Sequence, residues 1–212
     1  MVESSLGRAC KPADIDCTQQ IRDSALVILA ETGGIQSAGF MQDFDIHAHT
    51  AGRGLVVCTH RSHLQVLSIQ FHCQAGFELA DVEFAVDNAC PARIVTGYRA
   101  PHAALLSNQE FLADIVARPS SAPLLVILGD FNCDTAISDA LPLCDIGSTT
   151  NLGTAIDQCY THQSCGTVET YFSYHKAVWM SLPGSGTAAP PLSPTHQQRN
   201  EPVGSYGNQT AR

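Results

Sequence analysis

Basic side chains, charged residues in general and long apolar runs are all scarce in this chain of 212 residues. Its 11 Lys and Arg against 20 Asp and Glu leave a net charge of −9, and charged residues make up only 15% of the chain. Such a deficit of basic charge argues against a protein that holds nucleic acid on a broad cationic face. The longest apolar runs, Ala25–Ala30 and Leu124–Leu128, are far shorter than the ~20 residues of a membrane span. We therefore expect no membrane partner.

The hydrophobic fraction of 44% is too high for a disordered acidic chain, and the length suits one domain with a sizeable core. Residues 183–212 are rich in Pro, Gly and Ser and show no hydrophobic period, which predicts a disordered tail. Residues 1–182 are predicted to form one domain. The first residues have neither a basic stretch nor an apolar one, so we expect no signal peptide and an intracellular location.

Nine cysteines are an odd number without paired spacing, which is a poor disulfide framework and typical of reduced, packed thiols. Cys159, His162 and Cys165 form the one local cluster. Zinc sites usually present paired cysteines two to four residues apart, and this chain contains no C-x-x-C. The spacing therefore argues against a zinc site.

Apolar and alternating runs predict a protein rich in strands. The predicted strands are Ala25–Ala30, Gly54–Thr59, Leu64–His72, Glu78–Val86, Arg93–Tyr98, Leu124–Leu128, Ala155–Tyr160 and Lys176–Leu182. Ala25–Ala30 and Leu124–Leu128 are apolar on both faces, as in central, doubly covered strands. Helices are few: a weak candidate lies at Asp14–Asp23. A second follows Ser107 and Glu110, whose spacing predicts a capping box. These elements predict packed sheets with helices outside.

Polar residues follow several of the predicted strands. They are Glu31, Tyr98, Arg99, Asp130 and Asn132, with Asp157 and His175 in or near the late strands. A single carboxylate of this kind is usually a solvated loop residue. Together, however, the types complement one another, since ligands gather where strands end in layered α/β folds. Carboxylates, an amide, a phenol and an imidazole are what metal-assisted attack on a phosphodiester requires.

Five motifs resemble, in order, those of the endonuclease/exonuclease/phosphatase superfamily over about residues 20–182. The clearest is Gly129-Asp-Phe-Asn132 after an apolar strand. The others are Ile28-Leu-Ala-Glu31-Thr32, Gly97-Tyr-Arg-Ala-Pro101, Ile156-Asp-Gln158 and Ser173-Tyr-His-Lys176. The resemblance implies an α/β (α+β) fold, a four-layer α/β/β/α sandwich of two mixed sheets.

The resemblance also implies a Mg²⁺-dependent hydrolase of phosphodiesters, with Mn²⁺ as an alternative ion. Glu31 matches the family's metal ligand. Asp130 matches the residue that orients or deprotonates the attacking water, and Asn132 the amide that holds water or phosphate.

Three further positions carry family roles. His175 matches the histidine that binds the phosphate or stabilises the transition state, and Asp157 the carboxylate that orients it. Tyr98 matches a tyrosine that contacts phosphate or the leaving group. Arg53, Arg99 and Lys176 lie near these motifs and are candidates for phosphate contacts.

The segments Thr149–Thr154 and Tyr171–His175 look most like endonuclease domains of mobile elements, in retrotransposon polyproteins or beside PIF1-like helicases. We therefore expect a nuclear DNA endonuclease. The charge deficit predicts weak DNA binding by this chain alone, with a fused or neighbouring helicase or reverse-transcriptase domain as partner.

Two departures from the family keep other hypotheses open. Tyr174 stands where the family usually has an Asp, and a phenol cannot replace a carboxylate on Mg²⁺. The usual first strand with its Asn is reduced to Glu3–Leu6, so that strand is expected to be truncated at Met1. A degenerate, non-catalytic interaction module is one alternative. An enzyme acting on a lipid or RNA phosphate is the other.

Overall fold

The computed structural model of the protein describes residues 26–29, 42–49, 55–85, 91–168 and 175–181. No helix in these ranges is long and apolar enough to cross a membrane. The described elements are β1 (Leu26–Leu29), β2 (Phe44–Ala48), β3 (Val56–His60), β4 (Gln65–Gln74), β5 (Phe77–Ala85), β6 (Ala92–Arg99), α2 (Leu105–Val116), β7 (Leu124–Asp130), β8 (Asp157–Tyr160), β9 (Cys165–Val168) and β10 (Ala177–Met180).

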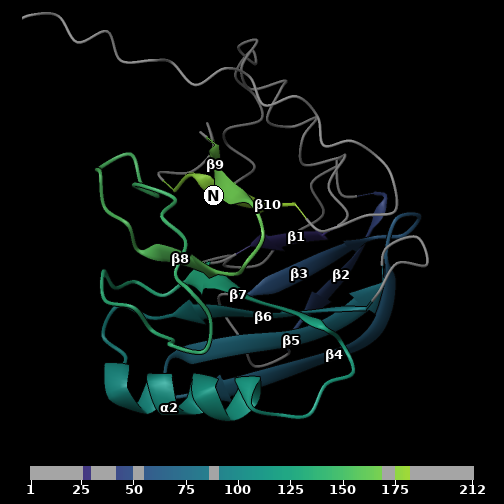
Figure 1. The fold of residues 1–212 in the computed structure, drawn as a ribbon, viewed down its shortest axis with the longest axis horizontal. Coiled ribbons are helices and arrows are strands. Elements are labelled where there is room, and N and C mark those ends of the chain that lie inside the picture. Colours follow the sequence, from purple (N-terminus) through teal and green to yellow (C-terminus); the bar gives the residue numbers. More distant parts are fainter. Residues whose placement is uncertain (1–25, 30–41, 50–54, 86–90, 169–174, 182–212) are drawn as a thin grey trace, which may run out of the picture.

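The strands form two main sheets and one short pair. Five strands make the larger sheet in the order β4-β5-β6-β7-β8, with β6 and β7 parallel and the other neighbours antiparallel. The smaller sheet has the order β1-β3-β2, and β9 pairs with β10. Figure 1 shows α2 on one side of the larger sheet and the smaller sheet on the other. The described part therefore supplies three layers of the expected sandwich, with a mixed larger sheet and an antiparallel smaller one.

Successive side chains of a strand point to opposite faces of the sheet, and in the larger sheet both sets of side chains are largely apolar. In β5, Ala80, Val82 and Phe84 join the core between the two sheets, whereas Phe77 and Leu79 join a second core. The core between the sheets also contains Leu55, just before β3, and residues of β3, β6 and β7, namely Val57, Ala92, Ile94 and Val126. The second core lies under α2 and includes Val95, Leu112, Ile115, Ile127 and Phe131.

The helix α2 buries one apolar face, and it begins earlier than predicted. Leu112 and Ile115 are fully buried. The helix begins at Leu105 after Ala104, however, and no side chain caps its first turn. Ser107 lies inside the helix, where its hydroxyl donates to the carbonyl of Ala104 at 3.3 Å. The capping-box prediction was therefore wrong, because the N-cap is Ala104, three residues before Ser107.

Arg93 connects the sheet to the end of the helix. Its guanidinium makes a two-pronged ion pair with Asp81 and donates to the carbonyls of Ile115, Val116 and Arg118. The hydrogen bonds to Asp81 raise the pKa of Arg93, in spite of its burial. Two carbonyls at the end of the helix, those of Ile115 and Val116, thus accept hydrogen bonds from Arg93.

Most predicted strands are confirmed within one or two residues at each end. Leu124–Leu128 is doubly covered as predicted, but β1 lies at the end of the described smaller sheet and is only half-buried. The strands β2 and β9 were not predicted. The predictions for Asp14–Asp23, for a truncated first strand and for the 183–212 tail fall outside the described residues.

Candidate functional site

A row of polar residues crosses one end of the larger sheet. Tyr98 pairs with Asp130 across β6 and β7, and Asp130 pairs with Asp157 across β7 and β8. Directly paired residues on neighbouring strands point to the same face of a sheet. Asp130 shares its face with Val126 and Leu128, which pack in the core between the two sheets. The row therefore lies on the inner face of the sandwich, at the end where β6 and β7 finish.

His175 joins this row from a distant part of the chain. It forms an isolated bridge with Thr150, and its Nδ1 lies 2.9 Å from Oδ2 of Asp157. The side chains of His175 and Asp157 are 16% and 13% exposed, so the pair is largely shielded from water. Because a carboxylate only accepts hydrogen bonds, the contact places a proton on Nδ1 of His175.

Asp130, Asp157 and His175 each offer one ligand atom, and these atoms all lie within 4.8 Å of one another. Two carboxylates at this distance suit a hard divalent cation such as Mg²⁺ or Mn²⁺, which prefers oxygen ligands. The donor set therefore fits a divalent ion. Its electrostatic role would be to offset negative charge gathered at the site.

The turn at Thr149–Thr154 holds Asp157 and His175 in place. The hydroxyl of Thr149 accepts from the backbone N–H of Asp157 at 3.1 Å, and its carbonyl accepts from the N–H of Lys176 at 2.7 Å. Gly153, with φ of +84°, allows the tight return of the chain. The segment that suggested a mobile-element endonuclease thus forms the support of the histidine and its carboxylate.

Two glycines bring the strands under the site together. Gly97 pairs with Gly129, and a Cβ added to Gly129 would lie 2.1 Å from the carbonyl oxygen of Gly97. No side chain fits at that distance. The glycine of the Gly-Asp-Phe-Asn motif is therefore required by the approach of two backbones next to Asp130.

Asn132 shapes the loop that follows Asp130. Its φ of +48° is left-handed, a conformation that Asn tolerates better than most residues. Its backbone N–H donates to Oδ1 of Asp130 at 3.1 Å, and its side-chain amide donates to the carbonyl of Arg99 at 2.9 Å. The Nδ2 group of Asn132 thus stabilises the loop through its hydrogen bond to Arg99.

Arg99 corrects one prediction. It is 6% exposed, and its guanidinium donates to the carbonyls of Phe131, Asn132 and Ala103. The register places it opposite Phe77, whose side chain belongs to the core under the helix. Arg99 therefore holds the loop after β7 rather than facing a phosphate. The prediction grouped Arg99 with Tyr98 because the two residues are adjacent in sequence. Adjacent residues in a strand point to opposite faces of the sheet, so the side chain of Arg99 lies on the other face.

Sequence reasoning missed Glu78, which extends the same row. Glu78 pairs with Tyr98 across β5 and β6, and its Oε2 accepts from the backbone N–H of Leu55 at 3.2 Å. The signal was present, since Glu78 shares the alternation of Ala80 and Val82, which face the core between the sheets.

The remaining predicted positions are not all described. Glu31, Arg53 and Tyr174 lie outside the described residues. Lys176 is described, and its ammonium donates to the hydroxyl of Ser148 at 3.3 Å. Asp130, Asp157 and His175 are brought together, with Tyr98 and Asn132 beside Asp130.

Comparison with known proteins gives structural matches without sequence matches. No protein-family model and no curated protein sequence matches the chain. Zebrafish (D. rerio) TDP2 in complex with a single-strand DNA product superposes with a TM-score of 0.55 at 10% identity, covering 78% of this chain and 88% of that one. The human Nocturnin catalytic domain gives 0.54 at 12% identity, covering 82% and 89%.

A third match carries a family description. An endonuclease/exonuclease/phosphatase from Beutenbergia cavernae gives a TM-score of 0.50 at 13% identity, covering 81% of this chain and 66% of that one. Structural matches at sequence identities this low are evidence for the fold alone. The mixed α/β architecture, with two main sheets and few helices, is therefore the fold of the endonuclease/exonuclease/phosphatase type.

Proposed function

We propose that this chain hydrolyses phosphodiester bonds in DNA with Mg²⁺ or Mn²⁺, as the endonuclease of a mobile element. The observation that carries the proposal is the convergence of Asp130, Asp157 and His175 on the inner face at one end of the sheet. The fold adds support, since one structure with it contains a single-strand DNA product. The mobile-element origin rests on the segments Thr149–Thr154 and Tyr171–His175.

Asp130 is the residue we assign to the attacking water. It is 3% exposed, and the N–H of Asn132 donates to one of its oxygens. That bond restricts the rotation of the carboxylate, so that its direction is set before substrate arrives. A positioned general base of this kind contributes about 10²–10⁴-fold to the rate.

His175 is assigned to the phosphate. With Nδ1 bonded to Asp157, the ring presents Nε2 as its second nitrogen. A protonated ring donates from Nε2 to a phosphate oxygen, and the nearby carboxylate stabilises that charged form. Tyr98, beside Asp130 in the row, is assigned to the same phosphate or to the leaving oxygen.

A divalent ion held by the carboxylates of Asp130 and Asp157, together with Glu31, would neutralise the charge that develops on the phosphate. Tyr174 replaces the family's usual Asp, so the chain is expected to rely on fewer acidic ligands. For this reason we expect a slow enzyme, and a non-catalytic relative is the second candidate.

The test is nicking of supercoiled plasmid by the full chain with Mg²⁺ or Mn²⁺. We expect nicking that EDTA abolishes and that Asp130→Asn lowers at least about 100-fold. Asp114→Asn is the matched control, because Asp114 is an exposed carboxylate on α2, on the far side of the sheet. It should nick like the wild type.

Several results would contradict the proposal. Absence of nicking with either ion favours the non-catalytic relative, and equal nicking by Asp130→Asn removes this site as its source. Faster turnover of a lipid phosphodiester or of RNA than of DNA would keep the hydrolase and replace its substrate.

A further inference from the structure

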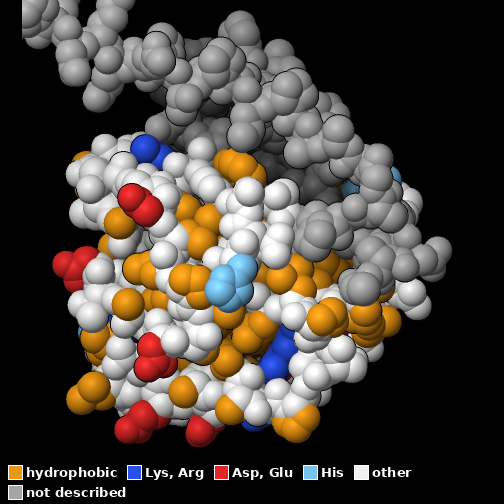
Figure 2. Space-filling model, viewed as in Figure 1, with side chains coloured by type: hydrophobic (Ala, Val, Ile, Leu, Met, Phe, Trp, Pro, Cys, Tyr) orange, Lys and Arg blue, Asp and Glu red, His pale blue; other side chains and the backbone are white. Residues whose placement is uncertain are grey.

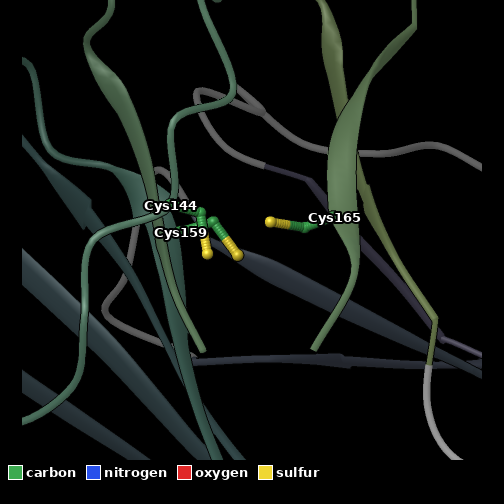
Figure 3. Close-up of side chains that lie close together, drawn as sticks. All are labelled: Cys144, Cys159 and Cys165. Carbon is green, nitrogen blue, oxygen red and sulfur yellow. The ribbon is translucent and has the colours of Figure 1, made fainter. Parts of the chain in front are cut away.

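Three cysteines from three segments of the chain meet beside the last strand of the larger sheet. Cys144 precedes β8, Cys159 lies in β8, and Cys165 is the first residue of β9. Their sulfur atoms all lie within 4.8 Å of one another. Figure 3 shows Cys144 and Cys159 side by side, with Cys165 pointing toward them from the facing strand.

The backbone around these cysteines is well defined by hydrogen bonds. The N–H of Cys144 donates to the carbonyl of Cys159 at 2.8 Å, and Leu143 forms a bridge with Tyr160. Cys165 pairs with Met180 in the β9–β10 hairpin. The convergence therefore joins three ordered segments and does not depend on the position of one loop.

The separation of the sulfurs suits a thiophilic metal ion. With Zn–S bonds of about 2.3 Å, the sulfurs of a tetrahedral site lie about 3.8 Å apart, within the observed limit. A disulfide would use two of the sulfurs and leave the third beside it. Among the described cysteines, none forms a disulfide.

Simple packing explains the three thiols less well than it explains Cys58. Burial alone raises the pKa of Cys58 to about 12, as expected for a cysteine that acts as a small hydrophobe. Cys144, Cys159 and Cys165 instead bring three sulfur atoms within 4.8 Å of one another, an arrangement that a soft cation can hold through metal–sulfur bonds.

We propose that Cys144, Cys159 and Cys165 bind one Zn²⁺ ion, which connects the β9–β10 hairpin to β8. Each thiol releases its proton to solvent as its sulfur binds the ion, and water takes the fourth position. This site is separate from the carboxylates and imidazole described above. Its structural effect is expected to reach them, because Asp157 lies on β8 and His175 lies two residues before the first residue of β10.

The spacing argument against zinc concerned Cys159, His162 and Cys165. Among the described residues, the cluster that forms contains Cys144 and does not include His162. Cys144 lies 15 positions before Cys159, so a search for closely paired ligands does not find it.

The direct test is the zinc content of the full chain. Protein purified with a non-thiol reductant, incubated with Zn²⁺ and desalted should retain one ion, measured by mass spectrometry of the metal. Cys144→Ser and Cys165→Ser should each lower the affinity more than about tenfold, the scale on which even supporting residues act. The matched control is Cys73→Ser, since Cys73 is an exposed cysteine in β4. Asp130→Asn should also keep the ion, which separates this site from the carboxylates.

Three measurements on the wild type do not depend on the folding of variants. Co²⁺ in place of Zn²⁺ should give sulfur-to-metal charge-transfer absorption, and Zn²⁺ should protect Cys144, Cys159 and Cys165 from alkylation. Zinc should also raise the melting temperature. Unchanged zinc content in both serine variants, alkylation that zinc does not slow, or a disulfide within the trio in the unreduced chain would each overturn the proposal.

Discussion

At the scale of single residues, Asp157 and His175 form a pair in direct contact. The 2.9 Å contact sets the proton on Nδ1 and the direction of the ring. The hydroxyl of Thr149 in turn holds the backbone of Asp157. Removal of either partner should therefore disturb the same property, which is the orientation and protonation of the imidazole.

A double-mutant cycle tests this dependence. We expect Asp157→Asn and His175→Gln each to slow plasmid nicking strongly, and the double variant to be little slower than the worse single one. The ring nitrogen shifts of His175, measured by NMR, should show a change of tautomer in Asp157→Asn. Losses that multiply in the double variant, with the tautomer unchanged, would show that the two residues act independently.

At the scale of secondary structure, the close approach of β6 and β7 decides where Asp130 lies. Gly97 and Gly129 face each other in parallel register, and both lack the side chain that would separate the strands. Phe131 packs near Gly97, so the turn after Asp130 is packed against the same strand. The position of the Asp130 carboxylate thus depends on two residues that have no side-chain functional group.

We expect Gly129→Ala to destabilise the protein by about 1–3 kcal/mol or more, because the added methyl forces the backbone of β6 to move. Urea unfolding followed by circular dichroism gives the free energy. Gly147→Asn is the control: Gly147 has φ of +70° with nothing near its Cβ position, and Asn tolerates that conformation. It should cost far less. Equal stability of Gly129→Ala and the wild type would show that β6 and β7 can separate freely.

At the scale of the whole molecule, little basic charge is available to hold DNA. Of the described basic residues, Arg61 pairs with Asp45, Arg93 pairs with Asp81, and Arg99 is bonded to carbonyls. On the face shown in Figure 2, the described side chains form no continuous basic surface. With a net charge of −9, the chain is expected to bind DNA weakly without a partner domain.

The dependence of binding on salt measures this directly. In fluorescence anisotropy with Ca²⁺ in place of Mg²⁺, we expect the logarithm of the affinity to fall with a slope no steeper than about −2, as for two phosphates neutralised. Lys176→Ala should reduce the slope by about one. Arg118→Ala should leave it unchanged, since Arg118 lies just after α2 on the other side of the sheet. A slope several units steeper would reveal a cationic surface and remove the need for a partner.

Local signals predicted most of the strands and the polar positions at their ends. They did not predict β2, although Phe44–Ala48 alternates apolar and polar residues, or β9, whose four residues include Gly166, a residue type depleted in strands. They misplaced the start of α2, because a cap depends on where the chain enters the helix. They also assigned Arg99 to phosphate, because the sequence does not show on which face of a strand end a side chain lies.

The sequence alone determined an apolar strand followed by Gly129 and Asp130, a later strand that contains Asp157, and a net charge of −9 with few basic residues. Periodicity and composition are local properties, and they can be recognised without knowing which strands meet. Only the tertiary structure decided that His175 meets Asp157, that Glu78 extends the row, and that three cysteines converge. These contacts join residues far apart in the chain, and strand register and sheet packing, not spacing, bring them together.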